Sequence, residues 1–86
     1  MQISKEIDDC FRRMIREQLE NNSEKTMVGA SLHAGRSKGW LSLYMSKGIE
    51  EMGLRDFCSI CNYFEIEPSW FFERVWDGDF LRSGMH

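Results

Sequence analysis

The chain is poor in residues that break helices, and it has no long apolar run. Its 86 residues include one proline and seven glycines, whereas 42% of them are hydrophobic and 13% aromatic. This composition argues against a disordered or collagen-like chain, and no run approaches the roughly 18 apolar residues of a membrane span. The sequence therefore predicts one small domain over residues 1–86, with a single core and no membrane partner.

Cysteines are few and odd in number: Cys10, Cys58 and Cys61. An odd count does not suit the disulfide framework of a secreted domain, and no apolar signal segment is found, so we expect a cytoplasmic protein. Cys58 and Cys61 stand three residues apart in a helical pattern and are expected to be small buried hydrophobes. A zinc site needs four ligands, and the remaining Cys10, His33 and His86 lack the spacing of a known pair. We expect neither a metal nor a cofactor.

The usual signatures of catalysis are also missing. The sequence has no glycine-rich phosphate loop, no plausible Ser-His-Asp set and no carboxylate pair in an evident pocket. The chain is therefore not expected to be an enzyme.

Acidic residues are absent from residues 25–48, although the whole chain has 14 of them. Four basic residues give this window a formal charge of +4, so the remainder carries −7 to reach the net charge of −3. Such a window suits a surface that approaches a polyanion, although it can also arise by chance. Because the pI is near 5.3, any nucleic-acid binding must be local.

Apolar residues recur at helical spacing in five segments, and nowhere with the period of two that marks a strand. The predicted helices are residues 4–21, 27–34, 37–46, 54–65 and 69–76. Ser23 or Thr26 is expected to cap the second helix, Gly35 to end it with a positive φ, and Ser37 to cap the third. The third helix is expected to stop near Gly48. The fold class is therefore all-α, with five short helices.

The tight connection after the second helix resembles the lambda-repressor/Cro-like (XRE) helix-turn-helix family of phage repressors. The likeness spans about residues 15–72. Residues 15–17 (IRE) look like the family's run closing helix one, and Ala30 stands where members have a small residue. Residues 34–42 (AGRSKGWLS) match a variant of its turn, and residues 64–71 (FEIEPSWF) are similar to its step into helix five. The resemblance implies a compact domain in which helices two and three form a DNA-binding helix-turn-helix.

The sequence departs from the family at two places. Many members pair an arginine of helix one with a glutamate near the end of helix three, whereas the matching position here is Met45 or a neighbour, and the nearest acids are Glu50 and Glu51. Gly39 lies within the predicted third helix and costs up to ~1 kcal/mol of helix propensity relative to alanine. Without a Cβ, however, the backbone there could approach a phosphate or a base edge.

The resemblance implies that the third helix lies in the major groove, with Leu41 and Tyr44 turned to the core. Lys38 could donate to a guanine, while Arg36 and Lys47 suit phosphates. Trp40 is expected either to touch a thymine methyl or to join the core. The predicted DNA contacts are Thr26, Arg36, Ser37, Lys38, Gly39, Trp40, Ser42, Leu43, Ser46 and Lys47.

The resemblance thus predicts a sequence-specific transcriptional regulator of the phage-repressor type that binds double-stranded DNA as a homodimer. Candidate dimer contacts lie in the aromatic C-terminal extension, residues 73–86, and just before it, and they could instead pack on helix one: Phe72, Val75, Trp76, Phe80 and Leu81. The alternative is a protein-binding module on the same scaffold, such as an antirepressor or inhibitor. The acidic balance and the aromatic C-terminus favour it, because Trp and Phe are enriched at interface hot spots.

Overall fold

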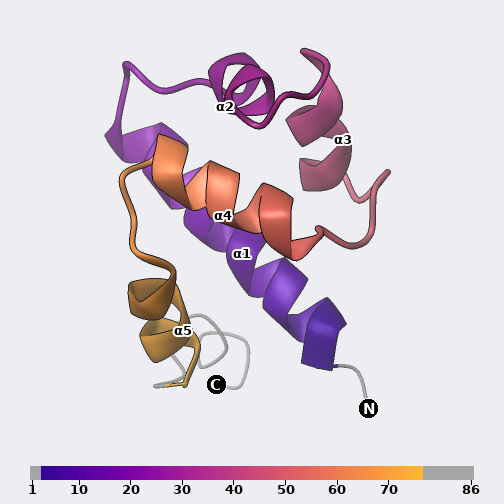
Figure 1. Cartoon of the computed structure of the whole chain (residues 1–86). Helices are drawn as coiled ribbons and strands as arrows, with labels where there is room; N and C mark the ends of the chain where they lie inside the picture. Colours follow the sequence, from indigo (N-terminus) through magenta and orange to yellow (C-terminus); the bar gives the residue numbers. More distant parts are fainter. Residues whose placement is uncertain (1–2, 77–86) are drawn as a thin grey trace.

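A computed structural model describes residues 3–76, with side chains from Glu6 onward. This part of the chain is all helical (Figure 1). Its helices are α1 (Ile3–Asn21), α2 (Met27–His33), α3 (Trp40–Met45), α4 (Leu54–Tyr63) and α5 (Pro68–Trp76). The predicted all-α class is confirmed for these residues, and none of these helices is long and apolar enough to cross a bilayer.

The long α1 runs diagonally through the molecule, and in this view α4 lies in front of it and runs in nearly the same direction (Figure 1). Helices α2 and α3 occupy one end, where α2 contacts both α3 and α4, whereas α5 packs on α1 at the other end. In this view α2 is seen along its axis and α3 from the side, so the two helices cross steeply. The α2–α3 unit, residues 26–48, is therefore held on one end of a support made by α1 and α4.

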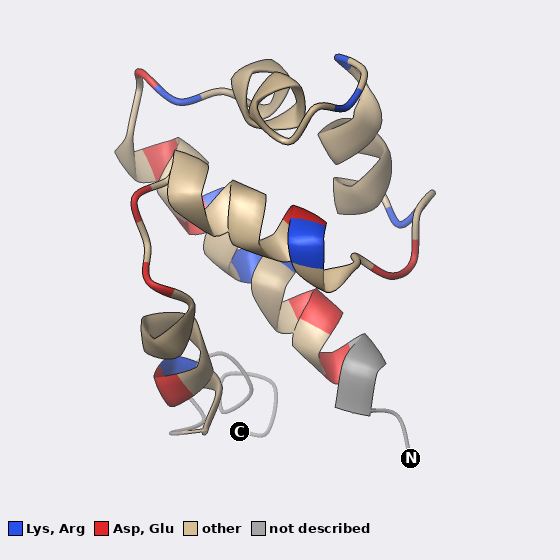
Figure 2. Cartoon of the chain, viewed as in Figure 1, with Lys and Arg blue, Asp and Glu red and all other residues tan. Residues whose placement is uncertain are grey.

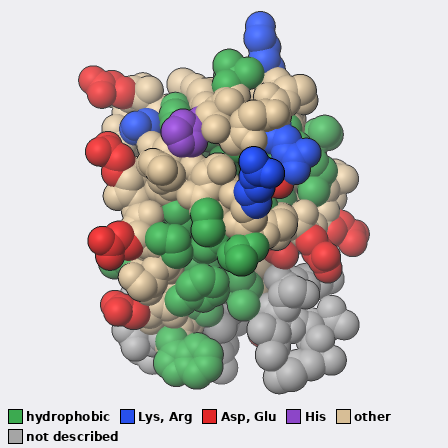
Figure 3. Space-filling model, in the orientation of Figure 1, with side chains coloured by type: hydrophobic (Ala, Val, Ile, Leu, Met, Phe, Trp, Pro, Cys, Tyr) green, Lys and Arg blue, Asp and Glu red, His purple; other side chains and the backbone are tan. Residues whose placement is uncertain are grey.

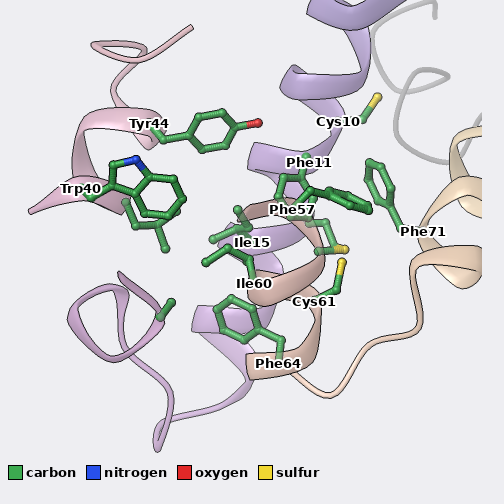
Figure 4. Packing of buried hydrophobic residues seen from close by; sticks show 13 residues of the cluster. Cys10, Phe11, Ile15, Trp40, Tyr44, Phe57, Ile60, Cys61, Phe64 and Phe71 are labelled. Atoms are coloured by element: carbon green, nitrogen blue, oxygen red, sulfur yellow. The ribbon is translucent and has the colours of Figure 1, made fainter. Parts of the chain in front are cut away.

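The core forms where the apolar stripes of the helices meet (Figure 4). Phe11 of α1 packs at centroid distances of 4.6 Å from Phe57 of α4 and 5.3 Å from Phe71 of α5. Aromatic pairs in such tilted or edge-on arrangements stabilise a core beyond their buried area alone. The buried hydrophobic residues are Cys10, Phe11, Met14, Ile15, Ala30, Trp40, Leu41, Tyr44, Phe57, Ile60, Cys61, Phe64 and Phe71.

The prediction that both cysteines of the Cys58-x2-Cys61 pair are buried is half wrong. Cys61 is buried in the core, and this burial raises the pKa of its thiol to about 12. Cys58 is exposed, because it lies on the side of α4 that no other described element covers. Among the described residues, no three His, Cys, Asp or Glu side chains gather in a group that could hold a metal ion.

Three helices end in the same hydrogen-bonded turn, in which one residue adopts a left-handed conformation. After α2 this residue is Gly35, at φ 74°, which confirms the predicted exit. After α3 it is Lys47, at φ 67°, next to Gly48, near which the third helix was expected to stop. After α4 it is Glu65, at φ 59°, with the amide of Ile66 donating to the carbonyl of Cys61 at 2.8 Å. Two of the turns therefore place a residue with a Cβ where glycine is preferred.

Replacing Glu65 by glycine is expected to raise the free energy of unfolding by up to about 1 kcal/mol, because glycine adopts a positive φ without steric cost. Urea denaturation followed by circular dichroism measures the change. Glu51 is also exposed but has no positive φ, so Glu51→Gly is the matched control and should bring no gain. A Glu65→Gly protein no more stable than Glu51→Gly would contradict this account of the turn.

Candidate nucleic-acid interface

Helix α3 is shorter than predicted, because it begins at Trp40 rather than at Ser37. Gly39 is its N-cap and therefore lies before the helix, not inside it. The predicted cap by Ser37 is wrong: no side-chain cap is present, and the carbonyl of Ser37 instead accepts from the amide of Trp40 at 3.1 Å in a turn. Lys38 therefore lies on an exposed turn that leads into α3.

The two faces of α3 differ sharply. Trp40, Leu41 and Tyr44 point into the core, and Trp40 is only 9% exposed (Figure 4). The predicted DNA contact by Trp40 is therefore corrected to core packing, the alternative that its helical spacing left open. The outward face presents Ser42, Leu43 and Ser46, all exposed. The exposed face thus offers two hydroxyl groups and one apolar side chain.

A buried serine joins α2 to α3. The hydroxyl of Ser31 donates to the carbonyl of Met27 at 2.8 Å and accepts from the amide of Leu41 at 3.0 Å. Because Ser31 is fully buried, neither bond competes with water. This pair of bonds satisfies an amide in the first turn of α3 and sets the position of α3 against α2.

A buried arginine holds the other end of α3. Arg12 of α1 is 5% exposed, and its Nε donates to the carbonyl of Tyr44 at 2.7 Å. Its Nη2 donates to the carbonyls of Ile49 and Glu50 at 2.9 and 3.1 Å, and its Nη1 pairs with Asp9 at 2.9 Å. Bonds to a charged donor are stronger than those between neutral groups, so Arg12 fixes the segment after α3 onto α1.

Asp8 completes this network one turn earlier on α1. It is buried, and it accepts from the Tyr44 hydroxyl at 2.5 Å and from the amide of Met52 at 3.2 Å. Burial, together with the hydrogen bond to Asp8, raises the pKa of Tyr44 far above its ordinary value. Tyr44 therefore keeps its proton and remains a donor to Asp8 throughout the physiological range.

The sequence reasoning missed Asp8, Arg12 and Ser31 because it treated charged and hydroxyl residues as solvent-facing. Helical spacing carried a signal: Asp8 and Arg12 are four apart and share a face with Ile15. Arg16, which stands in the run that resembles the family's, is exposed. The buried arginine is one turn earlier, and its main acceptors are carbonyls rather than the glutamate found in many family members.

Residues 25–48 contain no acidic residue, but acidic residues of other segments lie close to them in the fold (Figure 2). Arg36 pairs with Asp56 of α4 at 2.7 Å, and Lys47 lies 3.6 Å from Asp9 of α1. Lys38 is exposed and makes no ion pair with any described residue. Two of the predicted phosphate contacts thus already have a carboxylate partner, whereas the predicted base contact has none.

Thr26 caps α2, so of the two predicted caps, Ser23 and Thr26, the second is the one present. Its hydroxyl accepts from the amide of Gly29 at 2.9 Å, and its own amide donates to the Tyr63 hydroxyl at 3.1 Å. A Cβ added to Gly29 would crowd that hydroxyl oxygen, so a larger residue there would require the Tyr63 side chain to shift. Thr26 is exposed at the start of the α2–α3 unit, but its amide and hydroxyl both have protein partners.

The predicted dimer contacts fall partly within the described residues. Phe72 is 42% exposed and Trp76 is 91% exposed, whereas Val75 is half-buried and packs on the core. Phe80 and Leu81 lie outside the described residues. Leu54, at the start of α4, adds an exposed side chain that the sequence reasoning did not select. Figure 3 shows hydrophobic side chains gathered over α4 and α5, at the opposite end from α3.

No family model, curated protein or solved structure matches this chain. The resemblance to the lambda-repressor/Cro-like family therefore stays a prediction from residues 15–72.

Proposed function

We propose that this protein is a sequence-specific DNA-binding transcriptional regulator in which α2 and α3 form a helix-turn-helix and α3 enters the major groove. One observation carries the proposal: α3 is held at both ends by buried hydrogen bonds, one accepted by Ser31 and one donated by Arg12, while its opposite face is exposed and has no carboxylate. A recognition helix needs this combination, because base readout demands a rigid support and an accessible polar face.

The exposed residues suit the chemistry of base edges. Lys38 donates to guanine O6 or N7, the hydroxyl of Ser42 donates or accepts, and Leu43 packs against a thymine methyl. Ser46 is placed at the edge of the groove in this proposal, and its hydroxyl already donates to the carbonyl of Leu43 at 3.1 Å. Lys47 contacts a phosphate. Its ammonium group also lies 3.6 Å from the carboxylate of Asp9, which partly neutralises its charge.

A dimer is part of the proposal, because one short recognition helix contacts few base pairs. The exposed Phe72 and Trp76 lie at the end of the molecule away from α3. A second copy packed there would leave both recognition faces open to DNA. The expected operator is therefore a palindrome with two half-sites.

Selection of bound fragments from random duplex DNA tests the function directly. An enriched palindrome would support it and would define the half-site spacing. Failure to enrich any sequence, at low as well as physiological salt, would contradict it.

Replacing Lys38 by alanine is expected to cost about 1–3 kcal/mol of binding free energy on the selected site and to relax discrimination at one base pair. Lys47→Ala should instead weaken selected and random duplexes alike. Arg16→Ala removes the same charge from an exposed position on α1 and is the matched control. Fluorescence anisotropy on both duplexes measures the effects. Equal losses on both duplexes for Lys38→Ala would refute its base contact.

A protein-binding module, such as an antirepressor or inhibitor, is the second candidate function. The exposed Trp76, Phe72 and Leu54 favour it, as does the net charge of −3. Large exposed apolar side chains often mark a protein interface. In that case no duplex would be enriched, and Trp76→Ala would abolish binding of the protein partner.

A further inference from the structure

Arg36 and Asp56 form a two-point ion pair between the turn after α2 and the first turn of α4. The Nε of Arg36 donates to Oδ1 of Asp56 at 3.2 Å, and its Nη2 donates to Oδ2 at 2.7 Å. The Asp56 side chain is 13% exposed, whereas that of Arg36 is 49% exposed. The carboxylate is thus largely covered, and the guanidinium reaches the surface above it.

This pairing uses one edge of the guanidinium and leaves another available. The planar group carries five N–H donors, and its Nε and Nη2 hydrogens point along one side. One hydrogen of Nη1 and the second hydrogen of Nη2 form the outer edge of the group. No described residue accepts a hydrogen bond from this edge. That outer edge has the parallel pair of donors that a bidentate contact needs.

Trp40 further limits how Arg36 can turn. The guanidinium carbon lies 5.4 Å from the centroid of the Trp40 ring, within the range of a cation–π contact. The same ring is buried beside Tyr44, so it is itself held in place. Arg36 is therefore oriented from two sides, by a carboxylate and by an aromatic ring.

The charge of the pair indicates what the outer edge can recognise. Asp56 cancels the formal charge of Arg36, which weakens long-range attraction to phosphates. It does not remove the directed donors, and their fixed plane matches the O6 and N7 acceptors of a guanine. A residue that served only to attract phosphates would gain nothing from this partner.

We propose that Arg36 reads a guanine in the major groove through its outer N–H edge and that Asp56 is the residue that positions it. This inference rests on the proposed DNA-binding function and deepens it, because it names the base that one side chain selects. It also changes the role of Arg36 from a phosphate contact to a base contact.

The test uses the full-length protein and the duplex that the wild type enriches. Each guanine is replaced in turn by 7-deazaguanine, which lacks the N7 acceptor. In a second series, each G·C base pair is replaced by A·T. The wild type should discriminate by about 5- to 150-fold against a change at the guanine read by Arg36. Arg36→Lys keeps the charge but loses the planar fork of donors, and should weaken discrimination at that position alone, whereas Arg36→Ala should abolish it.

Asp56→Asn tests whether Asp56 positions the Arg36 side chain or only screens its positive charge. If Asp56 positions Arg36, the variant should lose discrimination at the same guanine, and Asp56→Glu should restore part of it. Affinity for random duplex should stay equal or rise, because a negative charge is removed. Arg55 is the matched control: it is exposed and adjacent on α4, so Arg55→Ala should leave the discrimination unchanged. The guanidinium of Arg36 is about half exposed, so these variants are expected to fold, and circular dichroism checks this.

Three results would overturn the inference. An Arg36→Ala protein that loses affinity equally for all duplexes would show a phosphate contact. An Asp56→Asn protein that binds every duplex more tightly, with unchanged discrimination, would show that Asp56 only screens charge. Both results would leave the proposed function standing, whereas a wild type that enriches no duplex would remove that function and the inference together.

Discussion

Replacing Arg12 by alanine is expected to lower the free energy of unfolding by about 2–4 kcal/mol. The substitution removes the charged donors to the carbonyls of Tyr44, Ile49 and Glu50, and the Tyr44 carbonyl keeps only its backbone amide partner from Lys47. It also removes the guanidinium that lies 4.3 Å from the centroid of the Tyr44 ring. Since a small domain has only about 5–15 kcal/mol of stability, this is a large fraction of the total. Urea denaturation followed by circular dichroism measures it.

Two further variants separate the causes of this loss. Arg16→Ala removes an equal charge from an exposed position on α1 and is expected to change stability by no more than about 0.5 kcal/mol. Arg12→Met retains most of the aliphatic volume but none of the donors, so it should be nearly as unstable as Arg12→Ala. If Arg12→Met were as stable as the wild type, packing rather than hydrogen bonding would be the role of Arg12.

Affinity for a single half-site is expected to fall by about a hundredfold between about 50 and about 200 mM salt, taking about four phosphates neutralised by one monomer, and the loss on the two-half-site operator should be larger. The physical reason is the release of condensed counterions when cations displace them from the duplex. Because the protein carries a net charge of −3, this attraction must come from a local surface, namely the α2–α3 unit. Fluorescence anisotropy over a series of salt concentrations gives the slope.

Single variants show which residues contribute to the salt dependence of binding. Lys47→Ala should reduce the slope by about one, as expected for a phosphate contact, and Arg16→Ala should leave it unchanged. If the guanine contact of Arg36 is correct, Arg36→Lys should also leave the slope unchanged while discrimination at that guanine is weakened. Binding that does not depend on salt would argue against a phosphate interface and favour the protein-binding candidate.

The sequence predicted the helices well because their signals are local. The repeat of Phe11 and Ile15 marked α1, Gly35 marked the end of α2, and the start of α2 was narrowed to a cap by Ser23 or Thr26, of which the structure has Thr26. It failed where two local signals competed. Ser37 looked like a cap, but the chain turns once more, and α3 begins at Trp40. The spacing of Trp40 placed it at the margin of the apolar stripe of α3, where it could face either the core or the solvent. Only the packing of the folded protein shows that it belongs to the core.

The polar residues that hold the candidate site were not predictable in the same way, because their partners are remote. Arg12 binds carbonyls 32 to 38 positions away, and the amide that binds Asp8 is 44 positions away. Asp56 is 20 positions from the Arg36 that it orients. No local pattern encodes such a pair, since the same residues on an uncovered face would simply be solvated.

The amino-acid order by itself determined an all-helical chain, the place of each described helix, and a basic window where acids are absent, since periodicity and charge are properties of neighbouring residues. Only the tertiary structure decided which polar side chains are buried and which cations already have an acidic partner. Burial and ion pairing depend on contacts between distant segments, and those contacts exist only once α1 and α4 have come together beneath the α2–α3 unit.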